Sequence, residues 1–177
     1  MPVLLVSGSP RTGGRTIHAV RALALELEEA GLATETLDLA QIDFPIYRGE
    51  PVSEFALEWR ELVRASDALI LASPEYHGGM SGAIKTFLDY LTFDEIRDRP
   101  VGLVGVAQSL HGGTRPALQL EDVVTALWAR VVGPILPVPN VREAFDESGR
   151  FRDPNLQRLV PIFITRLQAA LGESSAS

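Results

Sequence analysis

The sequence predicts an α/β fold, in which helices cover both faces of a parallel β-sheet. Short apolar runs alternate along the 177 residues with longer segments of helical periodicity, the pattern of repeated β-α-β units. Three of these runs, 3–7, 68–73 and 101–107, contain no charged residue. Strands that are buried on both faces have this composition, and such strands belong to parallel sheets with helices above and below.

The expected strands are apolar or alternating runs that end at turn residues. Gly8 ends the first run, and TETLDL at 34–39 alternates polar and apolar residues, as an edge strand does. The glycine-bearing loops PEYHGGM and QSLHGG follow the third and fourth runs. The five expected strands are therefore 3–7, 34–39, 68–73, 101–107 and 135–138.

The expected helices are amphipathic segments with start or stop signals. In the first, apolar residues recur at helical spacing over 17–27, and Gly31 is a C-terminal stop. Ser53 is expected to cap the second helix, and Pro154 marks the start of the last. The five expected helices are 15–30, 53–66, 81–91, 114–131 and 155–171.

Right-handed crossovers restrict five parallel strands to a few doubly wound orders. We expect the order 2-1-3-4-5, a flavodoxin-like three-layer sandwich around a five-stranded parallel sheet. In that order the loops after the first and third strands diverge, and a crevice opens at the carboxyl ends of these strands. A ligand site is therefore expected at the loops GSPRTGGRT and PEYHGGM.

The length and composition suit one compact domain, expected over 1–171, with GESSAS at 172–177 as a flexible tail. A net charge of −7 with scattered arginines argues against a nucleic acid or an anionic membrane as the main partner. The absence of cysteine excludes thiol catalysis and thiolate metal sites. The start MPVLLVSG lacks the basic residues of a signal peptide, so a cytoplasmic protein is expected.

The loop GSPRTGGRT has the composition of a phosphate site. Its three glycines let the backbone approach a ligand closely. Hydroxyl groups come from Ser9, Thr12 and Thr16, and Arg11 and Arg15 supply positive charge. The N-terminus of the following helix adds backbone N–H donors. The spacing fits neither a Walker A loop nor G-x-G-x-x-G. The alternative is a plain turn with hydroxyl capping, and the arginines favour a phosphate monoester instead.

The loops after the third and fourth strands suit a flat ring. Tyr76 and His77 offer flat faces, and the glycine pair after them leaves room for the edge of a planar ligand. The loop QSLHGGT adds a third wall. A mononucleotide-like ligand with a flat ring is therefore the simplest occupant of the crevice.

Other interpretations of these residues remain open. His77 and His111 have no nearby acids, so they are expected to be ordinary loop histidines and no metal site is predicted. Glu75 has no partner carboxylate and is interpreted first as a structural or interface residue. The pattern G-x-S-x-G is absent, so no hydrolase nucleophile and no catalytic side chain is predicted.

Three motifs give the chain a resemblance to a known family. GSPRTGGRT, PEYHGGMSGAIKTFLDYL and SLHGGTR are similar to motifs of the NAD(P)H-dependent FMN reductases, which include quinone, chromate and azo-dye reductases. The middle motif is the most specific, because family members typically read P-E-Y-N there, followed by P-G-x-L-K-N. This chain departs from the family at His77, at 79–81, and at Gly14, where many members have serine.

The resemblance implies a flavodoxin-like fold, FMN as cofactor and a role for each residue of the site. The phosphate of FMN would be held by Ser9, Arg11, Arg15 and Thr16. The isoalloxazine ring would run along Pro74, Glu75, Tyr76, His77 and Gly78, largely through backbone groups. The pyrimidine side of the ring would be approached by Ser109, Gly112 and Gly113.

The implied activity is that of an FMN-dependent oxidoreductase. It would take hydride from NADPH or NADH and pass electrons to a small acceptor such as a quinone, an azo compound, a metal oxyanion or free flavin. The flavin carries this chemistry, so no side chain need act as an acid or base. Members of the family are usually homodimers or homotetramers. The alternative is a flavodoxin-type electron carrier or a non-catalytic FMN-binding protein.

Overall fold

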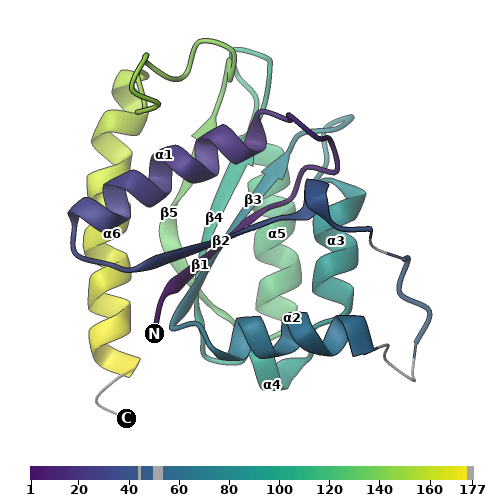
Figure 1. Ribbon diagram of the computed structural model, residues 1–177. Coiled ribbons are helices and arrows are strands. Elements are labelled where there is room, and N and C mark those ends of the chain that lie inside the picture. The colour runs from purple at the N-terminus through teal and green to yellow at the C-terminus, as the bar shows by residue number, and fades with distance from the viewer. Residues whose placement is uncertain (44, 50–53, 175–177) are drawn as a thin grey trace.

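The computed structural model describes residues 1–43, 45–49 and 54–174, and within them five strands form one sheet in the order β2-β1-β3-β4-β5 (Figure 1). Every neighbouring pair of strands runs parallel. The expected order 2-1-3-4-5 is therefore confirmed. The strands are β1 (Val3–Ser7), β2 (Thr34–Asp38), β3 (Ala68–Pro74), β4 (Pro100–Val106) and β5 (Arg130–Val138).

Helices cover both faces of the sheet, with α1 and α6 on one face and α2, α3 and α5 on the other (Figure 1). Alternate residues of a buried strand enter the two cores, so Leu5 packs toward α1 and α6 while Leu4 packs toward the other helices. The helices are α1 (Thr16–Glu29), α2 (Glu54–Arg64), α3 (Gly82–Asp89), α4 (Phe93–Ile96), α5 (Thr114–Ala126) and α6 (Pro154–Ser174), with the 3-10 turn η1 (Leu39–Gln41).

The expected boundaries are wrong around the last crossover. Helix α5 ends at Ala126 rather than 131, and β5 begins at Arg130 rather than 135. Trp128 adopts a left-handed backbone conformation with φ of 63°, and its amide donates to the carbonyl of Thr125 at 2.9 Å. This turn ends the helix, and the β-branched residues that follow pair with β4. Strand pairing in the tertiary structure thus overrides the local helical pattern.

Helix α4 was not expected from the sequence, and the other differences concern the ends of helices and strands. Helix α6 continues to Ser174, into the segment 172–177 that was expected to be a tail, and residues 175–177 lie outside the described residues. The expected cap of α2, Ser53, also lies outside them. Among the helices of the described residues, none is both long and apolar enough to cross a membrane.

Strand β4 carries two glycines at points where helices come too close for a side chain. A Cβ atom on Gly105 would lie 1.6 Å from the carbonyl oxygen of Gly113, the residue before α5. A Cβ atom on Gly102 would lie 2.4 Å from the ring of Phe163 in α6. These glycines let α5 and α6 pack directly against the backbone of the sheet.

Buried serines join the loops that follow β1 and β3. Ser81, the N-cap of α3, donates its hydroxyl to the carbonyl of Gly8 and accepts from the amide of Ile84 at 3.1 Å. The amide of Ser81 donates to the hydroxyl of Ser73 at 3.0 Å. The start of α3 is therefore held against the loop after β1, at the carboxyl ends of the neighbouring strands β1 and β3.

Replacing Gly105 tests the close approach of β4 and α5. Gly105→Ala is expected to lower the free energy of unfolding by about 3 kcal/mol, because both contacting groups are backbone and neither can rotate away. Urea unfolding of the protein without ligand, followed by circular dichroism, measures this change. Gly82→Ala is the control, since a Cβ atom there meets nothing within 4 Å. Its effect is expected to stay within about 1 kcal/mol. Equal stability of Gly105→Ala and the wild type would contradict the contact.

Candidate functional site

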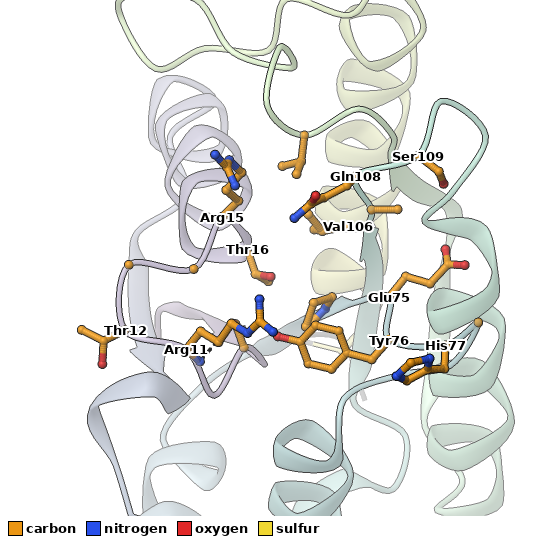
Figure 2. Close-up of a pocket in the computed structure, with 17 residues that line it drawn as sticks. Arg11, Thr12, Arg15, Thr16, Glu75, Tyr76, His77, Val106, Gln108 and Ser109 are labelled. Carbon is orange, nitrogen blue, oxygen red and sulfur yellow. Dashed lines mark hydrogen bonds between the residues drawn. The ribbon is translucent and has the colours of Figure 1, made fainter.

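A cleft of about 460 Å³ opens at the carboxyl edge of the sheet, between the loops after β1, β3 and β4 (Figure 2). Its volume lies within the roughly 300–1,000 Å³ that is typical of sites for small molecules. The cleft sits at the switch point of the sheet, where β1 and β3 are neighbours. Its lining residues are Ser9, Arg11, Thr12, Gly13, Gly14, Arg15, Thr16, Pro74, Glu75, Tyr76, His77, Gly78, Val106, Ala107, Gln108, Ser109 and Val141.

The first wall is the loop after β1, which leaves the N-terminus of α1 uncapped. Arg15 is the N-cap residue, and among the described residues no side chain caps this end. The first turn of α1 also has no acidic residue. Unpaired N–H groups and the partial positive charge of a helix N-terminus attract an anion. Thr16 is 2% exposed and lies at the wall of the cleft beside this terminus (Figure 2).

Two arginines add positive charge to this wall. In the described part of the chain, neither Arg11 nor Arg15 forms an ion pair with an acidic side chain. The guanidinium of Arg11 lies over the ring of Tyr76, with 5.5 Å between its Cζ atom and the ring centroid (Figure 2). This cation–π contact joins the loops after β1 and β3 across the cleft.

The loop after β1 is tightly curled. The hydroxyl of Ser9 accepts from the amide of Arg11 at 3.2 Å, and the amide of Gly14 donates to the carbonyl of Arg11 at 2.8 Å. Gly13 has a φ of 71°, which favours glycine. A Cβ atom on Gly14 would lie 2.5 Å from the hydroxyl of Ser9. A serine at position 14, which is common in the family that this chain resembles, would therefore displace the side chain of Ser9.

The second wall is a tight turn after β3. Tyr76 and Gly79 exchange backbone hydrogen bonds of 2.9 and 3.0 Å. Between them, His77 and Gly78 have φ of 52° and 77°, the positive values of a type I′ turn. Asparagine and glycine are preferred at such positions, so His77 stands where the turn itself favours asparagine. Within the described residues the amides of His77 and Gly78 have no partner, so they remain available as donors.

The third wall is the loop after β4, and only part of it lines the cleft. Gly112 and Gly113 do not line the cleft. The amide of Gly113 donates to Oε2 of Glu75 at 2.7 Å, so it is not free to approach a ligand. Ser109 does line the cleft, and its carbonyl accepts from the amide of Asn140 at 3.0 Å. Both glycines lie behind this surface, and their approach to the ring of FMN stays a prediction.

The structure brings most of the expected residues together. The lining includes Ser9, Arg11, Arg15, Thr16, Pro74, Glu75, Tyr76, His77, Gly78 and Ser109. Their contacts with FMN stay a prediction. The lining also includes Thr12, Gly13, Gly14 and Gln108, which belong to the loops expected at the site but were given no contact with FMN, and Val106, Ala107 and Val141, which were not expected there. Val106 ends β4 and residues 107–108 follow it, so the strand order could have identified them. No local signal indicates Val141, which follows β5.

The residues of the cleft fit FMN. At one end, Arg11, Arg15 and the uncapped N-terminus of α1 suit a phosphate dianion. At the other end, the flat ring of Tyr76 and the unpaired amides of the turn suit the face and the polar edge of a heterocycle. The decisive observation is the α1 terminus, which carries unpaired cations and no acidic residue in a protein whose net charge is −7.

Comparisons with known proteins agree with this geometry. The sequence profile of the NADPH-dependent FMN reductase family matches residues 1–143. An NADPH azoreductase from Bacillus sp. (strain OY1-2) is 33% identical over 135 residues, which are 75% of this chain and 73% of that protein. An NAD(P)H-dependent FMN reductase from Pseudomonas aeruginosa is 28% identical over 177 residues, which are 94% of this chain and 92% of that protein.

A solved structure shows the same architecture. The flavoenzyme NAD(P)H:(acceptor) oxidoreductase FerB from Paracoccus denitrificans has a TM-score of 0.78 and 19% identity to this chain, over 97% of each protein. This likeness establishes the shared flavodoxin-like fold. The match over residues 1–143 and the relative at 33% identity establish the family. The chain belongs to the NADPH-dependent FMN reductase family and is an FMN-dependent NAD(P)H oxidoreductase.

Proposed function

We propose that the cleft at the carboxyl edge of the sheet holds FMN, with the phosphate at the N-terminus of α1 and the ring along the loops after β3 and β4. The observation that carries this proposal is the uncapped α1 terminus beside Arg11 and Arg15. An anionic group bound there would meet both fixed charge and unpaired N–H donors. The protein as a whole repels anions, so the local arrangement has to supply the attraction.

At the phosphate end, each side chain has a distinct task. Arg15 lies at the helix terminus and adds charge next to the backbone donors. Thr16 supplies a hydroxyl from within the wall. The hydroxyl of Ser9 already orders the loop by accepting from the amide of Arg11, and it retains a hydrogen to donate. Arg11 reaches from the phosphate loop toward Tyr76, so it orients both ends of the ligand.

At the ring end, the backbone does most of the work. When bound, FMN supplies the redox chemistry, accepting hydride from NAD(P)H and passing electrons to the acceptor. The unpaired amides of His77 and Gly78 would donate to the polar edge of the ring. The turn holds these donors in place, because Tyr76 and Gly79 exchange backbone hydrogen bonds and the amide of Met80 donates to the side chain of Gln119 in α5 at 2.9 Å. Fixed donors stabilise developing charge better than mobile ones.

The electron acceptor is a small molecule. The candidate acceptors are azo compounds, quinones, metal oxyanions and free flavins, and of these we propose azo compounds. The Bacillus relative is named an NADPH azoreductase, as is an FMN-dependent relative from Staphylococcus aureus. These names also favour NADPH as the hydride donor.

We further propose that the chain acts in the cytoplasm as a homodimer or homotetramer. Leu57 of α2 and Leu118 of α5 are 46% and 47% exposed, on the face of the sheet that α3 also covers. Large apolar side chains on one face suit contact between copies of the chain. The cytoplasm is the expected site because it supplies reduced nicotinamide.

One spectral series tests the activity. Protein incubated with FMN and desalted is expected to keep a flavin band, and NADPH added without oxygen is expected to bleach it. Adding an azo dye should then restore the flavin band as the dye itself is reduced. A retained band that neither NADPH nor NADH bleaches would contradict the reductase function in favour of an electron carrier. Failure to retain or bind any FMN would contradict the cleft assignment.

A double variant tests the phosphate end. Arg15→Gln with Thr16→Val is expected to weaken FMN binding by at least roughly 100-fold, since each lost charge-assisted hydrogen bond costs about 1.5–3 kcal/mol. Riboflavin lacks the phosphate, so its affinity should change by less than about threefold. Arg21→Gln, an exposed position on α1 outside the cleft, is the control and should alter neither affinity. Calorimetric titration measures the affinities for FMN and riboflavin of the wild type, the double variant and Arg21→Gln. Equal losses for FMN and riboflavin would mean that the loop is only a turn.

Light scattering tests the oligomer. The wild type is expected to show at least twice the mass of the 19.2 kDa chain. Leu57→Glu with Leu118→Glu should lower that mass, because two charges would be buried without partners. Leu25→Glu in α1, where Leu25 is 39% exposed on the opposite face, should leave it unchanged. A wild type that is monomeric at micromolar concentration would refute the proposal.

A further inference from the structure

The carboxylate of Glu75 bridges two walls of the cleft. The residue follows β3, and its backbone amide donates to the carbonyl of Val106 in β4 at 2.8 Å. Its side chain crosses to the loop after β4, where Oε2 accepts from the amide of Gly113 at 2.7 Å. Figure 2 shows this side chain extending from the second wall toward the side of the cleft where Ser109 lies. Glu75 therefore links loops that come from neighbouring strands.

The packing around Gly112 shows how closely the loop follows this carboxylate. A Cβ atom on Gly112 would lie 3.1 Å from Oε2 of Glu75, 2.4 Å from the hydroxyl of Ser109 and 2.3 Å from the side chain of Ala107. Glycine is required for the loop to pass between these groups. On its other side the loop is held by Asn140, whose amide donates to the carbonyl of Ser109. Glu75 thus supplies the anchor of the loop on the β3 side.

The charge of Glu75 also divides the cleft into two ends. Glu75 is the one acidic residue of the cleft lining in the described residues, and within them it forms no ion pair. The partial positive charge at the N-terminus of α5 stabilises the carboxylate of Glu75 at this position. Arg11 and Arg15 lie in the first wall, the loop after β1. A ligand in the cleft would therefore meet the cations of the first wall, one of which reaches Tyr76, and a single fixed negative charge at Glu75.

We propose that Glu75 is a positioning residue that holds the loop 108–113 in place and, through its charge, lowers the reduction potential of FMN bound in the cleft. The proposal rests on the function proposed above. Reduction adds negative charge to a flavin, and a fixed carboxylate nearby opposes that charge. The cleft in this way favours passing electrons on to the acceptor. A carboxamide at position 75 could keep the hydrogen bond to Gly113 while removing the charge, so the two roles are separable.

Glu75→Gln isolates the charge. Its amide oxygen can still accept from Gly113, so the affinity for oxidised FMN should stay within about threefold of the wild type. The affinity for reduced FMN relative to oxidised FMN should rise about tenfold, which for a two-electron couple is a shift of about +30 mV. Redox titration against a dye of known potential measures this shift. Glu121→Gln, the same change on α5 outside the cleft lining, should leave the potential unchanged.

Glu75→Ala isolates the positioning role, with a readout that needs no flavin. In the protein without FMN, the segment 108–113 should exchange its amide hydrogens faster in Glu75→Ala than in the wild type, and Glu75→Gln should restore the slow exchange. Unchanged exchange in Glu75→Ala would overturn the positioning role. An unchanged potential in Glu75→Gln, with FMN bound normally, would overturn the charge effect. A wild type that does not bind FMN would overturn the proposed function and this inference with it.

Discussion

The backbone contact between Gly105 of β4 and Gly113 before α5 is the constraint on which most of the cleft depends. It brings the start of α5 directly onto the sheet. From that position the amide of Gly113 meets Glu75, and Gln119 reaches the amide of Met80 next to the turn of the second wall. Two walls that belong to different loops are therefore placed by one close approach, which glycine alone permits.

The first wall is placed by a different constraint, the neighbouring position of β1 and β3 in the sheet. Ser81 before α3 donates to the carbonyl of Gly8, which holds the phosphate loop against the loop after β3. Helix α1 then runs in the direction opposite to β1, with its N-terminus at the cleft. The positive end of the helix, Arg11 and Arg15 thus face the same space as the turn at Tyr76, although the whole chain is acidic.

The cleft illustrates how a common architecture acquires a redox function. The sandwich supplies a rigid edge, and loops of a few residues supply donors, charge and a flat surface. None of these groups needs to transfer a proton or form a bond, because the cofactor of this family carries the chemistry. Selection of one acceptor or donor over another therefore has to lie in the shape and charge of the three walls, among which Glu75 contributes the acidic group.

The sequence by itself determined the strands, the strand order and the loops that form the cleft. Apolar runs and glycine turns are local signals, and right-handed crossovers convert them into a topology. Local pattern failed near Trp128, because pairing with β4 decided where α5 ends and β5 begins. Only the tertiary structure showed that Glu75 binds the amide of Gly113 and that Val141 reaches the cleft. Periodicity and turn chemistry describe neighbours along the chain, whereas these contacts join segments that meet only when the sheet is assembled.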